Sequence, residues 1–105
     1  MRIVYITTRN ASEAKKISQH LLKKKLAGCV NIFPIESMYW WQDEIQEDVE
    51  FVLLVKTADD KFEEIEKEII KLHKYDIPAI YSWKIDKVNE KYEKWINNNC
   101  KKIKK

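Results

Sequence analysis

The chain has 105 residues, with 20 basic and 17 acidic side chains and a formal net charge of +3. A chain of this length buries about two thirds of its unfolded surface around a single core, so residues 1–105 form one domain without room for a second. The net charge of +3 is too small to indicate nucleic-acid binding by itself, and most of the basic excess lies in residues 101–105.

Cysteine usage and the N-terminal residues predict a soluble cytoplasmic protein. Cys29 and Cys100 lie far apart, unlike the dense and even cysteines of a secreted disulfide scaffold. The apolar run at residues 3–6 is much shorter than a signal peptide or the roughly 20 residues of a membrane span. Abundant lysine and glutamate beside a single glycine fit a thermostable protein, and fit a lysine-rich genome equally well.

The chain begins with a predicted strand and helix. Residues 2–8 are β-branched and aromatic, with apolar side chains on both alternating faces, which is typical of a strand covered on both sides. Asn10 followed by Glu13 matches the start signal of a helix, which we expect to end near Lys25.

Residues 29–57 predict a long antiparallel hairpin. Its first strand runs from residue 29 to about residue 41, a polar turn follows at 42–44, and residues 50–56 form a dense β-forming run. Pro34 indicates either a bulge or a position where no backbone donor is needed.

The second half of the chain predicts a helix, a strand and a short last helix. Apolar residues between positions 62 and 72 recur at i, i+3, i+7 and i+10, the spacing of one helical face. Pro78 ends this segment, residues 80–85 form the fourth strand, and apolar residues within 92–96 mark the last helix. The predicted order is therefore β-α-β-β-α-β-α.

This order predicts an α+β domain with the ferredoxin-like β-α-β-β-α-β fold and a short C-terminal helix. Helices then cover one face of a four-stranded antiparallel sheet and leave the other face open. The strands are nevertheless apolar on both faces, and such a face would exceed the roughly few hundred Å² of exposed apolar patch that monomers tolerate. We therefore expect strands of another copy of the chain to cover it.

Three consecutive aromatic residues, Tyr39, Trp40 and Trp41, lie near the end of the hairpin. Because side chains of a strand alternate between faces, at least one of these rings points away from its own core. The rings pack within the chain or enter a neighbouring subunit. We favour a subunit interface, because aromatic anchors concentrate at interface centres.

Four ordered motifs cover most of the chain: LAGCVNI at 26–32, SMYWW at 37–41, VKT at 55–57 and HKYDIPAI at 73–80. Through these motifs the chain resembles the divalent-cation tolerance protein CutA family. The resemblance implies a tight homotrimer with interlocking hairpins, similar in architecture to the PII signalling proteins. It also implies an association with copper and other divalent cations.

Cys29 and His73 are the candidate metal ligands. A thiolate and an imidazole suit a soft or borderline cation such as copper or zinc, and the family uses the loop that contains His73. Cys29 is otherwise a small buried apolar residue and His73 a solvated residue at a helix end. The resemblance also implies that some members of the family have a copper-ligating cysteine at the position of Thr7. Threonine is a poor ligand for copper. His20 carries no motif and is expected at the surface.

Acidic residues gather around the hairpin turn, where they are either ligands for a hard divalent ion or a solvated tip. They are Asp43, Glu44, Glu47, Asp48 and Glu50.

The sequence favours a non-enzymatic trimer that binds or responds to divalent metals. The alternative is a PII-like signalling trimer that binds a small molecule at its subunit clefts. A nucleic-acid module is disfavoured because the third strand begins with the acidic segment 47–50 and lacks exposed aromatics on a basic strand. Catalysis is disfavoured because the chain has only two arginines, no glycine-rich loop and no evident pair of nucleophile and base.

Overall fold

The computed structural model describes residues 1–100, and the basic segment 101–105 lies outside the described residues. Four strands and three helices follow in the predicted order. They are β1 (Arg2–Thr8), α1 (Ala11–Lys23), β2 (Cys29–Trp41), β3 (Glu44–Thr57), α2 (Phe62–Leu72), β4 (Ile80–Lys84) and α3 (Glu90–Asn99). Among residues 1–100, none of the helices combines the length and apolar character that a bilayer crossing requires.

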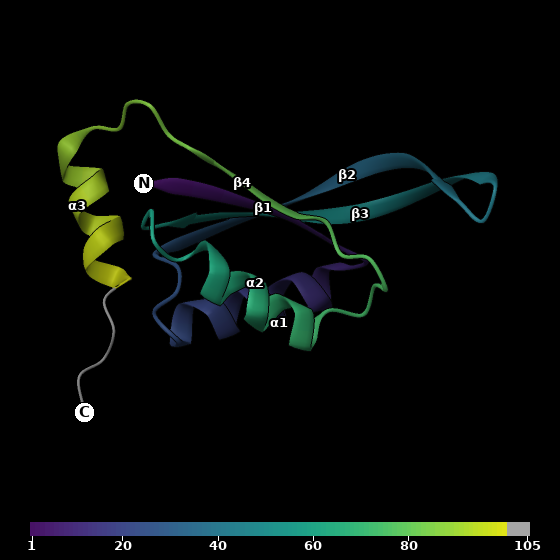
Figure 1. Cartoon of the computed structure of the whole chain (residues 1–105), viewed down its shortest axis with the longest axis horizontal. Coiled ribbons are helices and arrows are strands. Elements are labelled where there is room, and N and C mark those ends of the chain that lie inside the picture. The colour runs from purple at the N-terminus through teal and green to yellow at the C-terminus, as the bar shows by residue number, and fades with distance from the viewer. Residues whose placement is uncertain (101–105) are drawn as a thin grey trace.

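The sheet is antiparallel throughout and has the strand order β2-β3-β1-β4, which is the ferredoxin-like topology. Helices α1 and α2 lie side by side on one face of the sheet, and α3 packs at the end away from the hairpin tip (Figure 1). The predicted α+β fold with a short C-terminal helix is confirmed.

Helix α1 begins where the sequence indicates. The Asn10 side chain accepts a hydrogen bond of 2.8 Å from the backbone N–H of Glu13, and the Glu13 carboxylate accepts one of 3.1 Å from the backbone N–H of Arg9. The helix ends at Lys23, slightly before the predicted end, because Lys25 takes a left-handed backbone conformation with φ of 60°.

The β2–β3 hairpin extends beyond the β-forming run at residues 50–56, because β3 already begins at Glu44. The two strands pair in one regular register, without a bulge, from Cys29 opposite Lys56 to Trp41 opposite Glu44. Pro34 lies opposite Phe51 on the edge strand β2, so the bulge alternative is wrong and a proline is tolerated at the sheet edge. Gln42 and Asp43 both have positive φ, 50° and 64°, the pattern of a tight type I′ turn. The hairpin end therefore projects beyond the helices (Figure 1).

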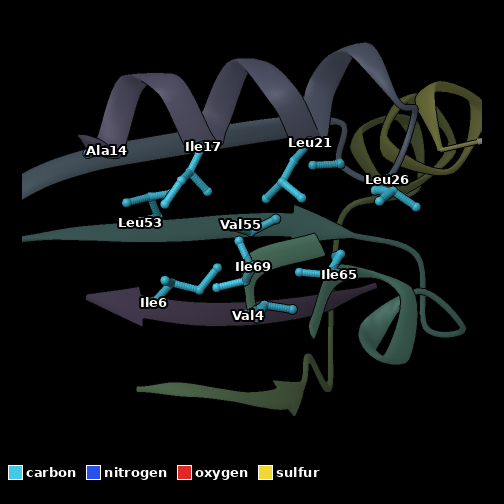
Figure 2. Close-up of a cluster of buried hydrophobic side chains, with 11 residues drawn as sticks. Val4, Ile6, Ala14, Ile17, Leu21, Leu26, Leu53, Val55, Ile65 and Ile69 are labelled. Carbon is cyan, nitrogen blue, oxygen red and sulfur yellow. The ribbon is translucent and has the colours of Figure 1, made fainter. Parts of the chain in front are cut away.

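The main core lies between the sheet and helices α1 and α2 (Figure 2). Alternate residues of β1 and β3 point toward the helices, whose apolar faces meet them. The buried side chains that form this layer are Val4, Ile6, Ala14, Ile17, Leu21, Leu26, Ala27, Leu53, Val55, Ile65 and Ile69. The helical spacing of the sequence thus becomes a continuous apolar contact.

Helix α3 covers only one end of the opposite face. Ile96 is fully buried there against Met1, Ile3 and Cys100. A Cβ atom on Gly28 would lie 3.1 Å from the Ile96 Cα, so the single glycine of the chain permits this close approach of the helix.

Among the helices of residues 1–100, none lies over the rest of the opposite face. Tyr81 and Trp83 of β4 keep 52% and 44% of their surface exposed, although both lie within the sheet. The prediction that the strands are apolar on both faces is therefore confirmed.

Candidate functional site

The segment between α2 and β4 approaches the uncovered face of the sheet near the end of β1. Helix α2 ends as the backbone of His73 becomes extended, with φ of −74° and ψ of 143°, and the His73 N–H donates a bond of 2.8 Å to the Ile69 carbonyl. Pro78 follows and disfavours a return to helical conformation in the residue before it. Residues 73–79 therefore form a loop beside the base of the hairpin.

The His73 ring is held by backbone groups on both sides. Its Nε2 lies 2.6 Å from the Thr7 carbonyl oxygen, and its Nδ1 accepts a bond of 3.1 Å from the Tyr75 N–H. These partners assign the neutral tautomer with the proton on Nε2, which donates to Thr7. His73 thereby joins the loop to β1, and it can ligate a metal only by giving up one of these bonds.

Cys29 lies at the other end of the sheet from His73. It begins β2, pairs with Lys56 and packs against the small core formed beneath α3. Lys56 also pairs with Ile3, whereas His73 contacts Thr7 at the far end of the same strand β1. A single chain therefore does not bring Cys29 and His73 to one ion.

Thr7 adds no ligand of comparable strength. It is largely buried, at 9% exposure, and pairs with Val52 on the uncovered face. Across residues 1–100, no three or more histidine, cysteine, aspartate or glutamate side chains gather in a geometry that could hold a metal ion. The donor set of one chain thus does not fit a preformed metal centre.

A cleft of about 680 Å³ opens between the loop and the hairpin. Its walls include Tyr5 and Tyr81 from the sheet, Tyr75 from the loop and Trp40 from the hairpin. Tyr5 and Tyr81 stack with their ring centroids 4.9 Å apart. The cleft therefore has an aromatic wall on the uncovered face of the sheet.

Glu50 forms part of the cleft wall and is nearly buried, at 9% exposure. Its carboxylate accepts a bond of 2.8 Å from the Tyr75 hydroxyl, and burial followed by this bond raises the pKa of Tyr75. The expectation of a solvated acidic tip is therefore wrong for Glu50, which pairs with Ile35 well inside the hairpin. The alternation of β3 side chains carried the signal, because it places Glu50 on the same face as Val52.

The remaining predicted residues lie as follows. Trp40 is 71% exposed, and Tyr39 and Trp41 are each 40% exposed at the hairpin end. The Tyr39 hydroxyl donates to Asp48 on the facing strand, and this bond raises the pKa of Tyr39. His20 is not a free surface residue, because its Nε2 lies 2.7 Å from the Glu68 carboxylate of α2.

The ferredoxin-like chain, with one uncovered sheet face, has the fold of a protein described as PII-like. The PII-like protein CutA from Nostoc sp. PCC 7120, in its apo form, superposes with a TM-score of 0.90 and covers 98% of this chain and 100% of its own. Its identity to this chain is 22%, so the likeness shows the fold alone.

Sequence comparison identifies the family more narrowly. The family model described as "CutA1 divalent ion tolerance protein" matches residues 2–99. The divalent-cation tolerance protein CutA of Archaeoglobus fulgidus is 42% identical over 94 residues, which cover 90% of this chain and 92% of that protein. The protein of the same description from Pyrococcus horikoshii is 41% identical over 102 residues, covering 97% and 100%. The chain therefore belongs to the CutA family of divalent-cation tolerance proteins.

Solved structures agree with this assignment. The crystal structure of CutA1 from Pyrococcus horikoshii superposes with a TM-score of 0.93 at 40% identity and covers 97% of this chain and 100% of its own. Descriptions of relatives include chloroplastic proteins of Oryza sativa and Arabidopsis thaliana and a periplasmic protein of Archaeoglobus fulgidus. Membership of the family therefore does not fix a compartment.

Proposed function

We propose that this chain is a non-enzymatic, cytoplasmic homotrimer that binds or responds to divalent metal ions such as copper. One observation carries the metal response: the family model that spans residues 2–99 is described by tolerance to divalent ions and not by a catalysed reaction. Two cysteines that form no disulfide with each other agree with a reducing cytoplasm, and cell fractionation tests that location.

The exposed apolar residues of the hairpin end support the assembly. Met38 and Trp40 of β2 are 70% and 71% exposed, and Ile45 and Val49 of the facing strand are 59% and 61% exposed. Scattered exposed apolar residues are ordinary, but a contiguous group on one projecting element indicates an interaction surface. Interlocking hairpins would bury these side chains together with Tyr39 and Trp41.

His73 and Cys29 remain the proposed metal ligands, as two separate sites within each chain. His73 offers a ring nitrogen once the Tyr75 N–H or the Thr7 carbonyl releases it. Cys29 is half-buried and offers its thiolate at the opposite end of the sheet. A complete coordination shell at either ligand then requires donors from another subunit or from solvent.

Calorimetric titration with copper tests the assignment. We expect His73→Ala to weaken copper binding at least about tenfold, since a lost ligand costs more than 1.4 kcal/mol. Cys29→Ser is the matched comparison, because it removes the other donor from the opposite end of the sheet. Copper binding that is identical in the wild type and both variants would remove both residues from the metal site.

A second candidate function is a PII-like signalling trimer that binds a small molecule at its subunit clefts, with the cleft beside the hairpin as one wall of such a site. The volume of about 680 Å³ lies in the range of roughly 300–1,000 Å³ that is typical of ligand pockets, and it favours this function. Native mass spectrometry of the untagged protein would report the mass of the assembly and any bound metabolite. A trimer without any bound molecule, unchanged after incubation with cell extract, would count against this function.

A further inference from the structure

A second cleft, of about 390 Å³, lies on the helix side of the sheet. It opens between the start of α1 and the end of α2, two helices that lie side by side in Figure 1. Its volume lies within the roughly 300–1,000 Å³ that is typical of ligand pockets. The assembly proposed above buries the hairpin end and the uncovered face on the other side of the sheet, so it leaves this cleft open.

Basic side chains dominate the lining of this cleft. They are Arg9, Lys16, Lys71 and Lys74. Lys16 is exposed and takes part in none of the ion pairs within residues 1–100, whereas Lys71 lies 3.1 Å from the Glu68 carboxylate. Several cations around one concave surface focus a positive potential there. The cleft therefore favours a small anion.

Glu13 is the acidic residue of the lining, and it is buried to all but 8% of its surface. Its Oε1 accepts a bond of 3.1 Å from the backbone N–H of Arg9, while its Oε2 accepts no hydrogen bond within residues 1–100. The Arg9 Nε lies 4.0 Å from this Oε2, too far for a hydrogen bond, and the Arg9 side chain is 55% exposed, so it can move aside. A buried acceptor without a donor is costly. Glu13 therefore favours a guest that brings a hydrogen-bond donor together with its negative charge.

We propose that this cleft binds a phosphate group, either as the free ion or as a small monoester. Its anionic oxygens contact Arg9, Lys16 and Lys71, and its P–O–H group donates to the Oε2 of Glu13. A phosphate group combines both kinds of oxygen because its second pKa is about 6, and the guanidinium of arginine fits phosphate oxygens closely. None of the proposed metal ligands lines this cleft, so the inference goes beyond the proposed functions.

Phosphate, methyl phosphate and sulfate test the class of ligand on the assembled wild-type protein, by calorimetry at about pH 6 and constant ionic strength. Sulfate has the same tetrahedral shape and the larger charge at this pH, but it has no O–H donor. We expect phosphate to bind at least about tenfold more tightly than sulfate, because a hydrogen bond to a charged group is worth at least that factor. Equal or tighter binding of sulfate, or no saturable binding, overturns the proposal.

Methyl phosphate distinguishes the two sources of the group. Tighter binding of inorganic phosphate supports the free ion as the ligand, and equal or tighter binding of methyl phosphate supports an ester.

Lys16→Gln tests the cationic wall, and Lys15→Gln is its matched control. The two lysines are neighbours on α1 and both are exposed, but only Lys16 lines the cleft. We expect Lys16→Gln to weaken phosphate binding about tenfold and Lys15→Gln to change it less than about twofold, because only the first removes a charged donor from the guest. Equal effects of the two variants overturn the proposal.

Glu13→Gln tests the acceptor. The amide keeps an oxygen for the backbone N–H of Arg9 and offers an N–H donor to any anion. We expect this variant to lose the preference for phosphate over sulfate, and a preference that survives overturns the proposal. If Glu13→Gln does not fold, Arg9→Gln at an exposed position is expected to weaken phosphate binding about tenfold, and unchanged binding in that variant overturns the proposal.

Other outcomes separate this inference from the proposed functions. A copper response without phosphate binding overturns the inference and leaves the metal function intact. Phosphate binding that is lost in Lys16→Gln, while copper binding stays as in the wild type, supports a separate anion site whether or not the metal function holds.

Discussion

Leu53 and Leu54 are adjacent leucines of β3 that lie in different surroundings. Leu53 points toward α1 and α2 and is completely buried, whereas Leu54 points to the opposite face, where it is half-buried near α3. The alternation of side chains along one strand thus places some residues in a fully buried core on one face and leaves others partly exposed on the opposite face. The covered face explains how the chain folds, and the uncovered face carries the cleft.

The largest expected effect concerns the covered face. Leu53→Ala should lower the free energy of unfolding by about 2–5 kcal/mol, because it leaves a cavity between the sheet and the helices. Leu54→Ala is the matched control, with an expected loss of about 1–2 kcal/mol from partial burial. Urea denaturation at one low protein concentration measures both. Equal losses in the two variants would mean that the uncovered face is as fully packed as the core.

A smaller effect is expected at the hairpin, and it concerns association instead of folding. Trp40→Ser should weaken the assembly by about 2 kcal/mol per interface if Trp40 is an interface anchor, while far-ultraviolet circular dichroism stays unchanged. Trp95→Ser on α3 is the control, because this tryptophan is 50% exposed and lies on another element. Light scattering over a dilution series measures the effect, and the same dissociation point for both variants would remove Trp40 from the interface.

The smallest expected effect concerns the helices over the covered face. His20, Lys24 and Lys71 surround the Glu68 carboxylate, and their hydrogen bonds, with His20 first, lower the pKa of Glu68 to about 2. The folded pKa lies below the ordinary value of 4.5, so the ionised form favours folding. This contribution is present above pH 4.5 and is lost as the pH falls toward 2.

Glu68→Gln should therefore lower stability by about 1 kcal/mol at neutral pH, and the difference from the wild type should vanish near pH 2. Thermal unfolding across this pH range measures the change. Glu90→Gln, which removes an exposed pair with Lys94 on α3, is expected to have almost no effect. A constant difference at all pH values would contradict the assigned role of the Glu68 charge.

Much of the fold could be predicted because its signals are local. The start of α1 at Asn10 and the apolar face of α2 follow from capping and helical spacing, and the structure has both. The start of α2 carries no such local signal, because its N-cap residue Lys61 makes no side-chain hydrogen bond to the helix. The candidate site was harder to predict from the sequence, since Tyr75 and Glu50 are far apart in the chain. They come into contact only because the loop that contains Tyr75 folds against the hairpin.

The amino-acid sequence by itself determined the order of the elements, the two-sided apolar character of the strands and the family, because periodicity and motifs are properties of neighbouring residues. Only the tertiary structure decided that His73 holds its loop to β1, that Cys29 lies at the other end of the sheet, and that Glu50 is buried with a hydrogen bond from Tyr75. The physical reason is that burial and pairing depend on the register of distant strands, and the register of β3 carries Glu50 to the wall of the cleft.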